Sequence, residues 1–96
     1  MNYEEFQKTL SSAKPPAGIS DYLKSLWYDA TGDWEGAHNI IQNIDDSTAA
    51  WIHAYLHRKE GDTGNADYWY QRAGRKRPAI PLEQEWEDIV KACIQL

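Results

Sequence analysis

Two histidines within residues 51–75 stand four residues apart, and a glutamate follows the second of them by three residues. On an α-helix this spacing places His53 and His57 on one face, with Glu60 close to that face. Two imidazoles and one carboxylate form a ligand set that zinc or iron accepts. The stretch HAYLH lacks the glutamate that makes the metalloprotease motif HExxH chemically specific. The pattern leaves three interpretations open: packed structural histidines, a metal or general-base site, and exposed side chains.

A structural role is the interpretation that we favour for both histidines. Ala66 and Ala73 are small enough to leave room for the rings between the fourth and fifth expected helices. Asn65 or a backbone group there can satisfy the ring nitrogens. We therefore expect no cofactor and no bound metal, and in the metal alternative the ligands are both histidines and Glu60.

Three arginines of the same segment lie near aromatic residues in the sequence. Guanidinium groups beside aromatic faces hold phosphates, carboxylates and partner side chains. If one edge of each hairpin's first helix lines a groove, that groove can receive a peptide or an amphipathic helix. The candidate partner-binding residues are Tyr22, Leu26, Trp51, Tyr55, Arg58, Arg72 and Arg75.

These residues also have a structural interpretation, which the sequence does not exclude. Trp51 and Tyr55 can be core residues beneath a terminal helix. The two C-terminal arginines can lie in solvent or pair with Asp62 or Asp67. The interaction surface is therefore one of two alternatives at this point.

A short basic run at residues 72–77 differs from the rest of the chain, which has a formal net charge of −5. Basic side chains next to Tyr68 and Trp69 are typical of phosphate neutralisation and base stacking. Cations near the end of a helix also interact favourably with its dipole without any ligand. The overall acidity argues against nucleic acid and against an anionic membrane as partners.

No side chain is placed for nucleophilic catalysis. Cys93 falls on the apolar stripe of the last helix, where burial raises the pKa of a thiol and makes it inert. Residues 61–64 lack the lysine and the spacing of a phosphate-binding P-loop. The acidic residues of the last helix are expected mostly on its solvent side: Glu83, Glu85, Glu87 and Asp88.

A non-catalytic protein is the interpretation that we favour. The alternative is an enzyme or a small-ligand- or metal-binding protein that uses His53, His57, Glu60 and Arg58.

Length and composition indicate a single domain. A chain of 96 residues should bury roughly 60 to 70% of the surface that it exposes when unfolded. Five tryptophans and six tyrosines supply much of the core volume. The single cysteine and the absence of a signal-peptide pattern predict a cytoplasmic protein. No apolar run approaches the roughly 20 residues that span a bilayer, so no membrane association is expected.

Apolar residues recur at helical spacing in six stretches of the chain. These stretches are residues 3–10, 19–30, 34–44, 51–56, 66–73 and 82–94. Asn2 and Glu5 form a capping-box pattern before the first stretch. A linker with two prolines at residues 15–16 separates the first stretch from the second.

A Gly-Asp pair occurs twice, at Gly32-Asp33 and at Gly61-Asp62, and the offset is 61 − 32 = 29 residues. Glycine can end a helix in the left-handed conformation, and the following aspartate can cap the next helix. The apolar stripes on either side repeat with the same offset. The sequence therefore predicts two helical hairpins, at residues 19–46 and 47–78, followed by a capping helix at residues 81–96.

Residues 19–78 resemble tetratricopeptide repeats. The resemblance depends on the Gly-Asp hinges, on an alanine four residues after each aspartate, and on the aromatic or isoleucine residue four positions later. The residues concerned are Ala37, Ala66, Ile41, Tyr70, Ala73 and Pro78. The pattern WxHAxLHRxEGD at residues 51–62 is also similar to a signature of small microbial proteins, which implies no particular activity. The tetratricopeptide likeness implies a protein- or peptide-binding module.

Together these patterns predict an all-α domain of about six helices, with two tetratricopeptide-like hairpins flanked by an N-terminal and a C-terminal helix. The predicted function is a non-catalytic interaction module with a protein or peptide partner. Arrays of this kind usually need three repeats. The two end helices can therefore act as caps, or the chain can form a homodimer.

Overall fold

The computed structural model describes residues 1–96 and contains six α-helices, one short 3₁₀ helix and no β-strand. The α-helices are α1 (Tyr3–Lys8), α2 (Asp21–Ala30), α3 (Trp34–Ile41), α4 (Ser47–Lys59), α5 (Thr63–Arg72) and α6 (Leu82–Ile94); the 3₁₀ helix is η1 (Thr9–Ser11). The predicted all-α fold with about six helices is confirmed. None of the helices has the length and apolar content needed to cross a membrane.

Side-chain caps begin five of the six α-helices. The caps are Asn2, Ser20, Asp33, Asp46 and Asp62, and each accepts a hydrogen bond from a backbone amide in the first turn of its helix. Asn2 and Glu5 form the predicted capping box. Each such cap stabilises a helix by about 1 kcal/mol. The start of each of these helices is therefore set by residues close to it in the sequence.

Glycines at positive φ form the two hinges. Gly32 has φ 94° and Gly61 has φ 86°, in the left-handed region that disfavours other residues. The next amide in each hinge donates to a carbonyl five residues earlier, from Asp33 to Tyr28 and from Asp62 to His57. The chain reverses at both points, so α2 packs against α3 and α4 packs against α5. The two predicted hairpins are present.

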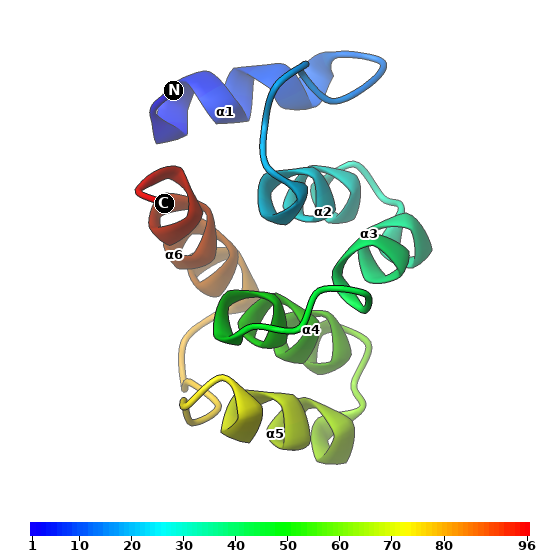
Figure 1. Cartoon of the computed structure of the whole chain (residues 1–96), viewed down its shortest axis with the longest axis vertical. Helices are drawn as coiled ribbons and strands as arrows, with labels where there is room; N and C mark the ends of the chain where they lie inside the picture. The colour runs from blue at the N-terminus through cyan, green and yellow to red at the C-terminus, as the bar shows by residue number, and fades with distance from the viewer.

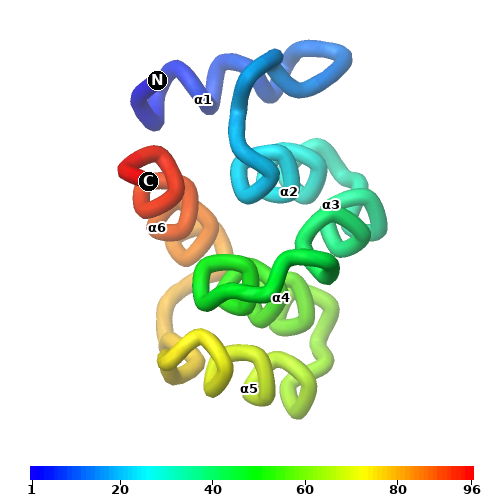
Figure 2. Tube along the Cα trace, in the orientation of Figure 1, coloured from blue at the N-terminus to red at the C-terminus, as the bar shows by residue number.

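Helix α4 lies at the centre of the molecule (Figure 1), where it contacts α2, α3, α5 and α6. Helix α1 lies at one end of the long axis and α5 at the other. The Cα trace shows the N-terminal segment and the end of α6 on the same side of the molecule (Figure 2), and α1 contacts α6. Side chains on α4 can therefore reach several different helix seams.

The main hydrophobic core lies between α2, α4 and α6. Leu26, Ile52, Leu56 and Ile89 are fully buried there. A smaller cluster of Ala54, Ala66 and Tyr70 joins α4 to α5. Helix α6 packs on α2 and α4 and buries the apolar side of the hairpins, which is how a capping helix was expected to act.

Candidate functional site

All three histidines of the chain come together at one point. His38 extends from α3, while His53 and His57 extend from α4, and one ring nitrogen of each lies within 4.8 Å of the others. The Nε2 atoms of His38 and His53 are 3.0 Å apart. His53 and His57 are buried, and His38 is half-buried. We call these three residues the histidine cluster.

Two tryptophans hold the rings of the histidine cluster in place. The Trp34 ring stacks on His38 with centroids 5.0 Å apart and an interplanar angle of 12°. The Trp69 ring of α5 stacks on His53 at 3.9 Å and 17°. Stacked aromatic walls restrict the rotation of the imidazoles and keep water away from their faces. The cluster is therefore ordered before any ligand binds.

His57 has polar partners on both ring nitrogens. Its Nδ1 lies 2.9 Å from Oε1 of Glu60, and its Nε2 lies 3.4 Å from the side-chain nitrogen of Asn65. Because a carboxylate only accepts hydrogen bonds, neutral His57 carries its proton on Nδ1 and keeps a lone pair on Nε2. A carboxylate that holds the distal nitrogen in this way is the usual outer partner of a metal-binding histidine.

Burial keeps two of the three imidazoles neutral. Burial, together with the smaller effects of the neighbouring His38 and His57, lowers the pKa of His53 from 6.5 to about 4. The pKa of His38 is also lowered, first by burial and then by His57. A histidine must be neutral to ligate a metal ion. Both residues are therefore neutral at neutral pH, and each has one ring nitrogen with a lone pair.

The spacing of the nitrogens is close to what a metal ion needs. Zinc binds imidazole nitrogen at about 2.0–2.1 Å, which places two tetrahedral ligands about 3.3 Å apart. The 3.0 Å separation of His38 and His53 lies near that value. One ring nitrogen of His57 also lies within 4.8 Å of nitrogens of the other two residues, so the rings would have to move closer together to bind one ion. Three protein ligands leave one coordination position open.

The structure changes the ligand set that the sequence suggested. Glu60 contacts the Nδ1 atom of His57 and supports that ring, while His38 from α3 takes the third position. Glu60 and Asp62 do form a second group with His57, but both carboxylates are exposed and Asp62 caps α5. The sequence analysis predicted that His53 and His57 lie between α4 and α5. The third imidazole, that of His38, reaches them because α3 contacts α4.

His38 was missed because its partners are 15 residues or more away in the sequence. One signal could have found it. Stacked hairpins place the second helix of one repeat against the first helix of the next. His38 stands on such a second helix, one turn after Trp34, and a search for histidines on both helices would have included it.

Most of the predicted groove is filled by the chain itself. Leu26 is 0% exposed and Tyr55 is 3% exposed, because both belong to the core that α6 covers. Tyr22 is half-buried, and its hydroxyl donates to Asp46. Trp51 is also half-buried, and its indole nitrogen donates to the Glu85 carboxylate at 3.2 Å. Helix α6 covers the surface that the predicted groove would have used. Leu26 and Tyr55 are therefore core residues.

Arg58 belongs to a buried polar network centred on Glu85. Its Nη1 donates to Glu85 Oε1 at 2.8 Å, and its Nη2 donates to the carbonyl of Ile80. The Tyr70 hydroxyl lies 2.8 and 2.7 Å from the two oxygens of the same carboxylate. Glu85 is 1% exposed, so the expectation of a solvent-facing carboxylate is wrong at this position. Arg58 therefore hydrogen-bonds to residues of its own chain and is not part of the histidine cluster.

The two C-terminal arginines have separate surroundings. The Arg75 guanidinium lies 3.5 Å from the centroid of the Trp51 ring. Arg72 donates to the Tyr68 hydroxyl at 3.1 Å and pairs with Asp45 at 3.3 Å. Neither arginine pairs with Asp62 or Asp67. Arg77 pairs with Asp67 instead, at 3.4 Å.

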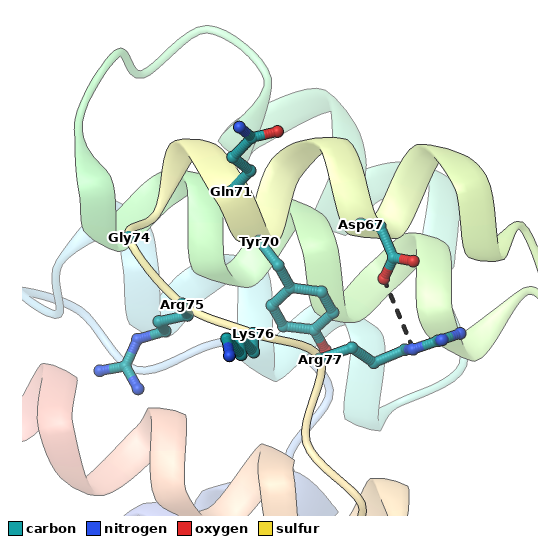
Figure 3. A pocket seen from close by; sticks show the side chains of 7 residues that line it. All are labelled: Asp67, Tyr70, Gln71, Gly74, Arg75, Lys76 and Arg77. Carbon is teal, nitrogen blue, oxygen red and sulfur yellow. Dashed lines mark ion pairs between the residues drawn. The ribbon is translucent and has the colours of Figure 1, made fainter.

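A basic cavity of about 650 Å³ opens beside the end of α5. Figure 3 shows the ion pair of Asp67 and Arg77 on one side of it, with Arg75 extending away from that pair. The other lining residues are Tyr70, Gln71, Gly74 and Lys76. Arg75 and Lys76 are exposed and, unlike Leu26 and Tyr55, can contact a partner.

Comparisons with known proteins give no match: no family model, no curated protein and no solved structure matches this chain. The resemblance to tetratricopeptide repeats stays a prediction. A fold alone does not specify a function, so the function has to be argued from the sites. The histidine cluster is the site with the most specific chemistry.

Proposed function

We propose that the protein binds one divalent transition-metal ion, with zinc as the first candidate, through His38, His53 and His57. The observation that supports this proposal is the convergence of all three imidazoles of the chain, with one nitrogen of each within 4.8 Å of the others. Imidazole ligands suit zinc, copper and nickel. The lowered pKa values of His38 and His53 favour the neutral, ligating form of both rings.

Packing alone is a poor explanation for the cluster. Without a ligand, the Nε2 atoms of His38 and His53 share a single hydrogen bond, so one ring must donate and the other accept. Protonation of any one ring places a charge beside two other imidazoles in a half-buried site. A bound cation would give the three rings one shared partner in place of that single hydrogen bond. The Glu60 carboxylate would offset part of the added charge.

Zinc titration of protein purified without a histidine tag, and first stripped with a chelator, tests the proposal. We expect one zinc ion per chain by calorimetry. His38→Gln changes the least buried ligand, so the variant should stay folded while its zinc affinity falls by about 100-fold or more. Asn39→Ala is the matched control, because Asn39 is the exposed neighbour of His38 on α3. Stoichiometric binding that survives His38→Gln, or no binding at micromolar zinc, would refute the proposal.

A second candidate function is the binding of a protein or peptide at the basic cavity. Unlike the predicted groove with its buried Leu26 and Tyr55, this site has exposed basic side chains. Its support is the open volume of about 650 Å³ together with the exposed side chains of Arg75 and Lys76. Tyr68, which lies on α5 outside the cavity lining, is 51% exposed. An acidic peptide has the complementary charge. Lys76→Glu should abolish the binding of a glutamate-rich model peptide, while Lys24→Glu on α2 should leave it unchanged.

A further inference from the structure

The three ligands of the proposed metal site come from both helical hairpins. His38 belongs to the first hairpin, which α2 and α3 form, whereas His53 and His57 belong to the second, which α4 and α5 form. An ion bound to all three would therefore connect α3 directly to α4. The nitrogens lie within 4.8 Å of one another, whereas tetrahedral zinc needs about 3.3 Å between ligands. Binding would thus draw the two helices together.

Helix α3 is short and has few buried side chains. Figure 1 shows it at the side of the molecule, next to α2 and α4. It has eight residues, of which Ala37 and Ile41 are buried, whereas α4 has eight buried residues among thirteen. Isolated helices of this length are unstable in water. The position of α3 therefore depends on its contacts with the neighbouring helices.

Two hydrogen bonds connect α3 to the second hairpin. The indole nitrogen of Trp34 donates to the carbonyl of Leu56 at 2.8 Å, and the Nε2 atoms of His38 and His53 share the other at 3.0 Å. No backbone hydrogen bond joins α3 to α4. The histidine cluster thus supplies one of the two hydrogen bonds that hold α3 on α4.

A segment with few buried contacts can open locally while the rest of the domain stays folded. The core between α2, α4 and α6 includes Leu26, Ile52 and Ile89, none of which belongs to α3. Helix α3 can therefore open while these residues stay packed. Such an opening separates His38 from the two histidines of α4 and destroys the metal site.

We propose that metal binding at the histidine cluster closes α3 on α4, and that α3 opens locally in the metal-free protein. This inference rests on the proposed function, because it assigns a structural consequence to the ion that the cluster binds. An ion that binds only the closed form lowers the population of the open form. The exposure of the apolar side of α3, with Ala37 and Ile41, then depends on the metal.

Hydrogen exchange of the full chain, first stripped with a chelator and followed by ¹H–¹⁵N NMR with and without zinc, tests the proposal. In the metal-free protein, the α3 amides should exchange at least about tenfold faster than the amides of residues 52–56 in α4. With free zinc at about 100 times its Kd, exchange of the α3 amides and of the Trp34 indole N–H should slow about 100-fold. The amides of α1, which packs on α6, should exchange at an unchanged rate.

Three variants show whether the effect passes through His38. His38→Gln removes one ligand, so the same zinc concentration should slow exchange of the α3 amides by about twofold or less. Asn39→Ala, at the exposed neighbouring position, is the matched control and should keep the slowing of about 100-fold. Trp34→Phe keeps a ring beside His38 but removes the hydrogen bond to Leu56. Its α3 amides should exchange about three- to tenfold faster without zinc, and zinc should still slow them.

Calorimetry on the same samples separates this inference from the proposed function. No bound zinc refutes both. One bound zinc ion per chain with unchanged exchange in α3, or with equal slowing in α1 and α3, overturns the inference and leaves the metal site in place. Metal-free α3 amides that exchange as slowly as those of α4 also overturn it.

Discussion

Removal of the buried carboxylate in Glu85→Ala should be among the most destabilising single substitutions outside the apolar core. In the wild type this side chain accepts from Arg58 at 2.8 Å, from Tyr70 at 2.8 and 2.7 Å, and from Trp51 at 3.2 Å. The side chain of Glu85 is 2% exposed and that of Arg58 is 18% exposed. The substitution therefore leaves a guanidinium, a phenol and an indole N–H in a site that water barely reaches.

The magnitude follows from the unpaired cation. Removal of one partner of a buried ion pair costs about 3–5 kcal/mol, because the other charge stays buried without compensation. The carbonyl of Ile80 still accepts from Arg58, which reduces that cost. We therefore expect a loss of about 4 kcal/mol, a large part of the 5–15 kcal/mol typical of whole domains. Glu85→Gln keeps the volume and an acceptor oxygen, so it should cost about 2 kcal/mol.

Equilibrium unfolding in urea, followed by far-ultraviolet circular dichroism, measures these differences. With a slope of about 1.5 kcal/mol/M, a loss of 4 kcal/mol lowers the midpoint by about 2–3 M. Glu83→Ala removes an exposed carboxylate from the same helical turn and should cost less than about 1 kcal/mol. A Glu85→Ala variant as stable as Glu83→Ala would show that the network around Glu85 contributes little and that our reasoning is wrong.

Three further predictions concern the histidine cluster, the cysteine and the hinges. Because the pKa of His53 is lowered from 6.5 to about 4 by folding, the unfolded chain binds more protons between these values. The metal-free protein should therefore lose roughly 3 kcal/mol as the pH falls from 6.5 to 4, and urea unfolding of His53→Gln should lack this part of the loss. Burial raises the pKa of the Cys93 thiol from 9.0 to about 12, so an aromatic disulfide reagent at pH 8 should react slowly with the folded protein and rapidly in urea; equal rates would contradict this. Gly61→Ala should cost about 1 kcal/mol because φ is 86° there, whereas Gly64→Ala within α5 should stabilise by about 0.5–1 kcal/mol, and equal midpoints for the two would refute the hinge assignment.

The histidine pair shows how far the sequence could lead towards a site. The i, i+4 spacing of His53 and His57 places both rings on one face of α4 because a helix turns once in 3.6 residues. The sequence also suggested Asn65 as a partner, and it lies 3.4 Å from His57. The third ring depends on how α3 packs against α4. Ligand spacing along one helix cannot reveal that contact.

The sequence alone determined the helices, their caps and the two glycine hinges, because these features depend on hydrogen bonds between residues three to five positions apart. The tertiary structure alone decided which distant side chains meet. His38 meets His53 across 15 residues, and Arg58 meets Glu85 across 27 residues. Such pairs depend on how the side chains of neighbouring helices interlock, which sets the distance and angle between the helices. For the same reason, the position of α6 decided that Leu26 and Tyr55 are core residues and that the histidine cluster is the more specific candidate site.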